Sequence, residues 1–148
     1  MALLNNKYAR FNYDIIDTYE AGIVLFGFEV KSLKKNQGSL KEAYAIIDNN
    51  EVYLVKAHIP PYQANNTPQS YDPYRRRKLL LKKSEIDRLI KAKKTEGLTI
   101  VPLSLYNKGR QLKLSVALAR GKKKHDKRET LKERDAKRHI DRTIKNTR

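Results

Sequence analysis

Two short patterns contain residue types that could support catalysis, and both have simpler explanations. Glu29-Val30-Lys31 matches the E-x-K element of metal-dependent nucleases, in which a carboxylate holds Mg²⁺ and a lysine assists the nucleophile. The alternation of apolar and polar residues from Phe28 to Leu33 accounts for the same residues as a half-buried strand. His125-Asp126 is an acid next to a base, but adjacent residues rarely place their side chains in hydrogen-bonding geometry. We therefore predict no catalytic residue and a protein that is not an enzyme.

Ligand sets for metals and cofactors are missing from the sequence as well. The chain has no cysteine, which excludes disulfides, thiol catalysis and thiolate zinc sites. Its three histidines, His58, His125 and His139, show no metal-ligand spacing. The 6 glycines are isolated and form no phosphate-binding loop. We expect neither a cofactor nor a bound metal.

The residues that the chain supplies in excess are cations and tyrosines. It carries 33 Lys/Arg against 16 Asp/Glu, a net charge of +17, together with 9 tyrosines. Lysine and arginine neutralise phosphates, and tyrosine can stack on unpaired bases. A carboxylate within such a surface is costly unless it accepts hydrogen bonds from base amines or 2′-OH groups, and Glu20, beside Gly22, is the candidate, with structural capping as the alternative. The composition favours nucleic acid as the partner over an anionic membrane surface.

No segment of the sequence resembles a membrane span or a secretion signal. No apolar run approaches the ~18–20 residues that cross a bilayer. The apolar stretch in Met1–Lys7 is too short for a signal peptide. We expect a cytoplasmic, monomeric protein with no membrane partner.

In the first half of the chain, the sequence predicts a basic leader followed by short strands. Residues 1–12 are polar and basic, and they form either a frayed segment or an arm that lies on RNA. Tyr13–Tyr19 has strand composition, Glu20–Gly27 is a helical turn or a bend, and Phe28–Leu33 is the predicted half-buried strand. Ser39–Glu42 has the composition of a brief helical turn.

Two hairpins are predicted from turn residues and alternation. Asp48-Asn49-Asn50-Glu51 joins strands 44–47 and 52–57, since asparagine tolerates positive φ. Strands 99–106 and 111–119 turn at Asn107-Lys108-Gly109. In the return strand, period two places alternate residues inside and Lys113 on the outer surface. The inward set is Leu112, Leu114, Val116 and Leu118.

Between the hairpins lie a long loop, a basic run and a helix. Residues 60–74 form an exposed loop whose tyrosines, Tyr62, Tyr71 and Tyr74, offer faces for stacking. The four cations of the basic run Arg75–Lys78 should repel one another unless a polyanion is near. Residues 84–96 form a helix that Ser84 caps and Gly97 ends.

The predicted fold is mainly β (α+β): an OB-like closed antiparallel β-barrel with flanking helices and a basic C-terminal tail that is disordered when free. The division is 1–12 basic leader, 13–123 barrel and 124–148 tail. From Arg120 to Arg148 there are 13 Lys/Arg against 5 Asp/Glu, and Glu133–Lys137 and Asp141–Lys145 are helix-favouring i, i+4 pairs. The tail is therefore expected to become helical on a charged surface, the alternative being a purely solubilising role.

Three motifs resemble the small protein B family, the SsrA-binding proteins of bacterial trans-translation. They are Tyr19–Leu25 with Glu29–Leu33, then Arg77–Leu81, and then Ala119–Lys123 followed by His125–Glu129. The resemblance implies an OB-like barrel that binds the tRNA-like domain of transfer-messenger RNA and delivers it to stalled ribosomes. It also implies that the tail enters the empty mRNA channel and meets small-subunit rRNA at the decoding centre. A general ribosomal protein or RNA chaperone would share the charge but lack these motifs.

The resemblance also assigns residues by motif. The decoding-centre group would be His125, Asp126, Lys127 and Arg128. The chain departs from many relatives at Phe11, where they have histidine, and at Lys82, where some have asparagine. The RNA-binding set would be Asn6, Lys7, Arg10, Glu20, Gly22, Lys78, Leu80, Lys82, Lys113, Gly121, Lys122 and Lys123.

Overall fold

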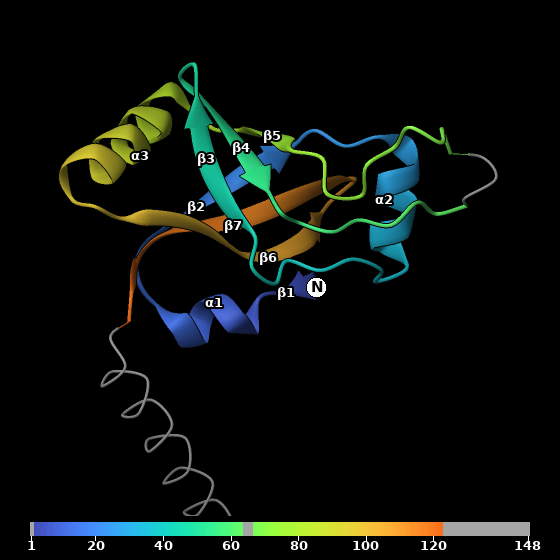
Figure 1. Cartoon of the computed structure of the whole chain (residues 1–148), viewed down its shortest axis with the longest axis horizontal. Helices are drawn as coiled ribbons and strands as arrows, with labels where there is room; N and C mark the ends of the chain where they lie inside the picture. The colour runs from blue at the N-terminus through green and yellow to red at the C-terminus, as the bar shows by residue number, and fades with distance from the viewer. Residues whose placement is uncertain (1, 64–66, 123–148) are drawn as a thin grey trace, which may run out of the picture.

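The computed structural model describes residues 2–63 and 67–122, which fold into seven strands and three helices (Figure 1). The three helices lie at separate sides of the strands. The elements in chain order are β1 Ala2–Asn5, α1 Lys7–Asn12, β2 Tyr13–Ile23, α2 Gly27–Lys34, β3 Tyr44–Asp48, β4 Glu51–Val55, β5 Arg77–Leu80, α3 Lys83–Thr95, β6 Thr99–Lys108 and β7 Gln111–Gly121. The prediction of a mainly β chain is confirmed. Within the described ranges, no helix is long and apolar enough to span a membrane.

All strand pairs are antiparallel, in the order β1-β6-β3-β4-β5-β2-β7. Strand β7 also pairs with β6, so the pairings of β6, β3, β4, β5, β2 and β7 form a cycle. The two long ladders, β2–β7 and β6–β7, share β7, whose Leu114, Val116 and Leu118 are buried as the alternation predicts. Strand β7 is therefore the central support of the fold.

The leader is an ordered part of the body. Strand β1 pairs with β6, and the backbone N–H of Asn6 donates to the carbonyl of Leu103 at 2.8 Å. Helix α1 buries Ala9 against Val101 and Ala117, on the side of β6 and β7 away from the main core. Alanines alternate with the core leucines along β7, and α1 covers them. The interpretation of residues 1–12 as a frayed segment is wrong.

The segment predicted as a half-buried strand is helix α2. The backbone N–H of Phe26 donates to Glu29 Oε1 at 2.8 Å, which closes a capping box at the helix start. Glu29, Ser32 and Leu33 are buried together, and the adjacent burial of Ser32 and Leu33 does not occur in an alternating strand. Alternation over only six residues did not distinguish the two structures.

Both hairpins form where predicted. Asn49 and Asn50 have φ of 52° and 61°, which suits the two-residue turn between β3 and β4. Strand β6 ends at Lys108 and β7 begins at Gln111, so the turn of the second hairpin lies at residues 109–110, slightly later than the predicted Asn107-Lys108-Gly109. Glu20 continues β2 and belongs to no helical turn.

The remaining local predictions are partly confirmed. Helix α3 ends before Gly97, whose φ is 64°, but it begins at Lys83, because Glu85 accepts the Lys82 N–H and Ser84 is not the cap. Ser39–Glu42 contains a turn and no helix. Ser39 instead forms a β-bridge with His58.

Candidate nucleic-acid interface

The residues assigned by motif divide between the two ends of the β2–β7 ladder. Gly22 pairs with Lys113 at one end, and Tyr13 pairs with Gly121 at the other. Nine residues of extended strand separate these pairs, or about 30 Å. The predicted set therefore does not form one compact site.

The first group is a surface formed by Glu20, Gly22, Leu80 and Lys113, here called the Glu20–Lys113 surface. Gly22 stands opposite Lys113 on β7 and opposite Leu80 on β5, so the register brings three distant segments together. A Cβ atom on Gly22 would lie 3.2 Å from Leu80 Cβ, which explains why a residue without a side chain suits this position. Leu80 is 54% exposed although it is a large apolar residue. Gly22 itself is buried, with the Leu80 side chain packed over it, so the exposed leucine is the group of this pair that is suited to contact a partner.

Glu20 carries the negative charge of this surface. Its carboxylate accepts hydrogen bonds from Lys108 Nζ at 2.8 Å and from the Tyr106 hydroxyl at 2.5 Å. These two hydrogen bonds, with the nearby charges of Lys108 and Lys113, lower the pKa of Glu20 despite some desolvation. Burial and the bond to Glu20 raise the pKa of Tyr106 to about 12. The capping interpretation of Glu20 is wrong, because its partners are side chains of β6.

The sequence did not reveal Tyr106 and Lys108 as parts of this surface. Both lie at the end of β6, and their positions depend on the β6–β7 and β2–β7 registers together. The available signal was the alternation of Tyr106 and Lys108 along the strand, which places the two side chains on the same face.

A hollow of about 300 Å³ adjoins Gly22. Ile23, Leu25 and Leu112 contribute apolar walls, while Arg110 and Lys113 add cations. An apolar hollow with cations beside it can receive a ribose or base edge while the cations contact phosphates.

Lys78 and Lys82 lie near the same end of the ladder. Lys78 alternates with Leu79 along β5, and its Nζ is 3.2 Å from Glu51 Oε1. Lys82 is exposed and precedes α3, with its backbone N–H donating to Glu85. Both ammonium groups reach solvent, although that of Lys78 has a protein partner.

The second group surrounds α1 at the far end of the ladder. Asn6 is 3% exposed: its Nδ2 donates to the Pro102 carbonyl and its Oδ1 accepts from the Ala9 N–H. It caps the helix, so its side chain does not face outward as the motif assignment predicted. Lys7 and Arg10 are exposed. Gly121 closes β7.

Lys122 follows β7, and its backbone N–H donates to the Asn12 carbonyl at 2.8 Å. The end of the described chain is thereby fixed next to α1. The remaining predicted residues, Lys123 and the decoding-centre group His125, Asp126, Lys127 and Arg128, lie outside the described residues.

Each cation of the basic run Arg75–Lys78 has a carboxylate partner within the protein, and Arg75 and Arg77 share one. Arg77 is fully buried, and its guanidinium donates two hydrogen bonds to Glu29 Oε2 at 3.0 and 2.6 Å. Arg75 forms an ion pair with the other carboxylate oxygen of Glu29. The prediction that these cations require an external polyanion is wrong.

The other two cations of the basic run pair at the surface. Arg76 Nη1 is 2.9 Å from Asp48 Oδ2, and Lys78 contacts Glu51. The aspartate and the glutamate flank the β3–β4 turn. One hairpin therefore supplies both counter-charges.

The position of Glu29 argues against the nuclease pattern. Its carboxylate is completely buried and is occupied by Arg75, Arg77 and the Tyr71 hydroxyl. Burial alone would raise the pKa of Glu29, but hydrogen bonds from Arg75, the Phe26 N–H, Arg77 and Tyr71 outweigh burial and lower it. A carboxylate held in this way has no free oxygen for Mg²⁺. Among the described residues no group of three or more His, Cys, Asp or Glu side chains is placed to hold a metal.

The three loop tyrosines have different roles. The Tyr71 hydroxyl donates to Glu29 and to the Ile59 carbonyl, and its ring packs edge-on to Phe28 at 4.7 Å. Tyr71 therefore belongs to the buried group of Glu29, Arg75 and Arg77, here called the Glu29 cluster, contrary to the prediction that it stacks on bases. Tyr74 is 57% exposed and Tyr62 is 36% exposed, so these two rings retain an open face.

Comparisons with known proteins agree on one family. The family model described as SmpB protein matches residues 3–146. The chain is 54% identical to the SsrA-binding protein of Allorhizobium ampelinum, over 95% of this chain and 89% of that protein. It is 49% identical to the SsrA-binding protein of Gloeothece citriformis, over 97% of this chain and 92% of that protein. The SsrA-binding protein of Clostridium acetobutylicum is 48% identical, over 99% and 94%.

A solved structure gives the same result for the fold. The match is to a chain in the structure described as "tmRNA-SmpB: a journey to the center of the bacterial ribosome". Its TM-score is 0.67 with 41% sequence identity, and the match covers 86% of this chain and 93% of that one.

Proposed function

The chain belongs to the SmpB protein family, and from that premise we propose that it binds the tRNA-like domain of transfer-messenger RNA and delivers it to stalled ribosomes for trans-translation. The relatives are SsrA-binding proteins, and the structural neighbour comes from a tmRNA–SmpB study of the ribosome. The observation that carries the proposal is the Glu20–Lys113 surface. It combines a carboxylate, an exposed leucine that covers a glycine, and a lysine, from three strands.

Each part of this surface has a chemical role toward RNA. Lys113 and Lys82 neutralise phosphates. Glu20 accepts hydrogen bonds from a base amine or a 2′-OH, which are uncharged donors and, unlike a phosphate, do not repel a carboxylate. Gly22 leaves room for the Leu80 side chain to lie over the strand, and Leu80 packs against a ribose or base. A surface that only attracted polyanions would not need an exposed carboxylate, so Glu20 favours recognition of a shaped RNA.

The remaining predictions complete the proposal. The cycle of strand pairings supports an OB-like closed barrel. The barrel acts as a non-catalytic, monomeric adaptor in the cytoplasm. Residues 124–148 form a separate basic tail that is disordered when free and becomes helical in the mRNA channel, where His125 to Arg128 contact small-subunit rRNA at the decoding centre. The attachment of Lys122 beside α1 determines where such a tail would leave the body.

Gel shifts over a salt series test the proposal. The tRNA-like domain, an unstructured RNA of equal length and an RNA duplex should be compared. The adaptor should prefer the tRNA-like domain by at least about tenfold at each salt concentration, because the shared phosphate contacts cancel between ligands. Comparable affinity for all three would support the alternative function, a general ribosomal protein or RNA chaperone, which predicts binding by charge alone.

Truncation separates the two parts of the chain. Ending the chain after Lys123 should leave affinity for the tRNA-like domain within a few-fold while abolishing tagging on stalled ribosomes. A loss of RNA affinity by orders of magnitude would contradict the division between body and tail.

A further inference from the structure

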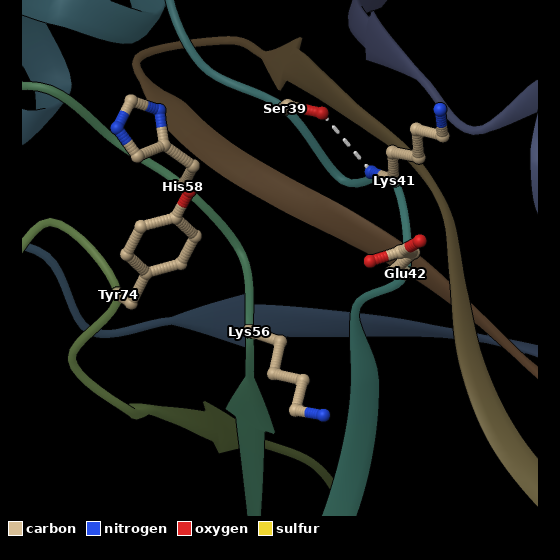
Figure 2. Close-up of a pocket in the computed structure, with 6 residues that line it drawn as sticks. All are labelled: Ser39, Lys41, Glu42, Lys56, His58 and Tyr74. Carbon is tan, nitrogen blue, oxygen red and sulfur yellow. Dashed lines mark hydrogen bonds between the residues drawn. The ribbon is translucent and has the colours of Figure 1, made fainter.

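A pocket on another part of the molecule is not used by the proposed function. It has a volume of about 500 Å³ and is lined by Ser39, Lys41, Glu42, Lys56, His58 and Tyr74. Figure 2 shows the rings of His58 and Tyr74 on one side and the side chains of Lys41, Glu42 and Lys56 on the other. The pocket thus has an aromatic wall and a charged wall.

Two residues of the charged wall have strained backbones. Glu42 and Lys56 have φ of 65° and 63°, in the left-handed region. The other non-glycine residues with positive φ in the described ranges are Asn36, Asn49 and Asn50, and asparagine tolerates this conformation. Strain at ordinary side chains is found preferentially at binding sites. Both such residues line this one pocket.

The two walls are fixed to each other by the backbone. Ser39 and His58 exchange two hydrogen bonds, at 2.8 and 3.0 Å. A Cβ atom on Gly38 would lie only 2.9 Å from the His58 carbonyl oxygen, so the glycine permits this close approach. The Tyr74 N–H donates to Asp72 Oδ1 at 2.9 Å. The pocket is therefore preorganised.

The aromatic wall presents a surface for a planar group. The centroids of the His58 and Tyr74 rings are 4.8 Å apart with the planes inclined by 51°, and Tyr74 is more than half exposed. Stacking on such rings requires the free face of a base, which a duplex does not offer. Figure 2 shows the side chains of Lys41 and Lys56 extending in opposite directions, so each can contact a different phosphate of an RNA backbone, and Glu42 can accept from a 2′-OH or a base amino group.

We propose that this pocket binds an unpaired nucleotide of single-stranded RNA, with the base on His58 and Tyr74, the flanking phosphates at Lys41 and Lys56, and Glu42 as hydrogen-bond acceptor. An adjoining hollow of about 210 Å³ shares Glu42 and Lys56. It adds the rings of Tyr8, Tyr13 and Tyr44, and Lys56 Nζ is 5.6 Å from the Tyr44 ring centroid. The bound RNA strand can therefore continue toward α1. This site is separate from the Glu20–Lys113 surface and does not depend on the proposed function.

The test follows the His58 ring by NMR in the full chain. The basic body and tail bind any polyanion, so a local signal is required. The probes are a five-nucleotide adenosine oligoribonucleotide and an abasic oligomer of the same length. The adenosine oligomer should shift the His58 ring signals saturably, with a Kd at least about fivefold below that of the abasic oligomer.

Variants identify the two walls. Tyr74→Ala should raise the Kd of the adenosine oligomer about tenfold, whereas Tyr62→Ala should not change it. Lys56→Gly removes the cation, so this variant should bind the oligomer more weakly, and the slope of log K against log[salt] should fall in magnitude by about 0.7. Glycine also accommodates the positive φ, so the variant should unfold at no lower temperature. Lys91→Ala, on the exposed face of α3, is the control for loss of one charge.

Three results would overturn the proposal. These are equal His58 shifts from the abasic oligomer, an unchanged Kd in Tyr74→Ala, or no saturable shift at all. Glu20→Ala separates this site from the proposed function. It should weaken binding of the tRNA-like domain without changing the His58 titration, so either hypothesis can fail while the other stands.

Discussion

The basic run Arg75–Lys78 and the Glu20–Lys113 surface are both charged, but the first is paired within the protein and the second is available to a ligand. The run has four consecutive cations, and each is paired with a carboxylate of the same chain. The surface has fewer charges, yet Lys113 lies beside an exposed leucine, Leu80, across Gly22. Arg77 finds Glu29 48 residues away in sequence. The comparison shows that cation density in a sequence does not tell which cations remain available to a ligand.

The largest expected effect separates stability from binding. Arg77→Met leaves the buried carboxylate of Glu29 without its main partner, so it should lower the free energy of unfolding by about 3–5 kcal/mol. Urea denaturation measures this change. Arg76→Ala is the matched control, since its ion pair is exposed and should contribute at most about 1 kcal/mol. Equal losses in the two variants would remove the distinction between buried and exposed members of the basic run.

The opposite result is expected at the surface. Gly22→Ala introduces a Cβ atom 3.2 Å from Leu80 Cβ and so displaces the exposed Leu80 side chain. Affinity for the tRNA-like domain should fall about tenfold, because the contact of Leu80 with the RNA is lost, while the free energy of unfolding changes by no more than about 1 kcal/mol. Gel shifts and urea denaturation on the same preparation distinguish the effects. Unchanged affinity would mean that Gly22 serves only strand packing.

Alkaline pH provides a smaller test of the Glu29 cluster. Burial and the hydrogen bond to Glu29 raise the pKa of Tyr71 to about 12 from 10.0. A raised pKa in the folded state contributes stability that is complete below pH 10.0 and is lost as the pH rises through about 12. The free energy of unfolding should therefore fall over that range. Tyr106 contributes in the same direction, since its pKa is also about 12.

Substitution to phenylalanine assigns this pH dependence. Tyr71→Phe should reduce the decline between pH 10 and about 12, and Tyr106→Phe should reduce it further. Tyr19 and Tyr53, whose pKa values are also raised, account for what remains. Tyr62→Phe is the control at an exposed ring. An undiminished decline in the Tyr71 and Tyr106 double variant would show that other groups cause it.

The sequence predicted those elements whose signals are local. Asn49-Asn50 specified the β3–β4 turn, and Gly97 specified the end of α3. Alternation along β7 identified its buried leucines. These features depend on residues within a few positions of one another, which is the range over which propensity and periodicity act.

Predictions failed where distant residues decide the structure. The segment around Glu29 is helical, and its carboxylate meets Arg75 and Arg77, partners that no local pattern indicates. The same carboxylate pairs two of the four cations of the basic run. At Asn6 the sequence did contain a local signal, since an asparagine before a short helix is an ordinary cap, and its side chain caps α1. Tyr106 and Lys108 join Glu20 only through the combined registers of three strands.

The central claim is that RNA recognition resides at the Glu20–Lys113 surface and not in the overall charge. The most direct measurement is the Kd for the tRNA-like domain of a Glu20→Ala/Lys113→Ala variant, compared with an Arg76→Ala/Asp48→Ala variant. Each pair removes one cation and one carboxylate, so the net charge stays the same in both. The proposed function predicts at least about a tenfold weaker complex for the first variant and less than about twofold change for the second. Equal affinities would contradict it.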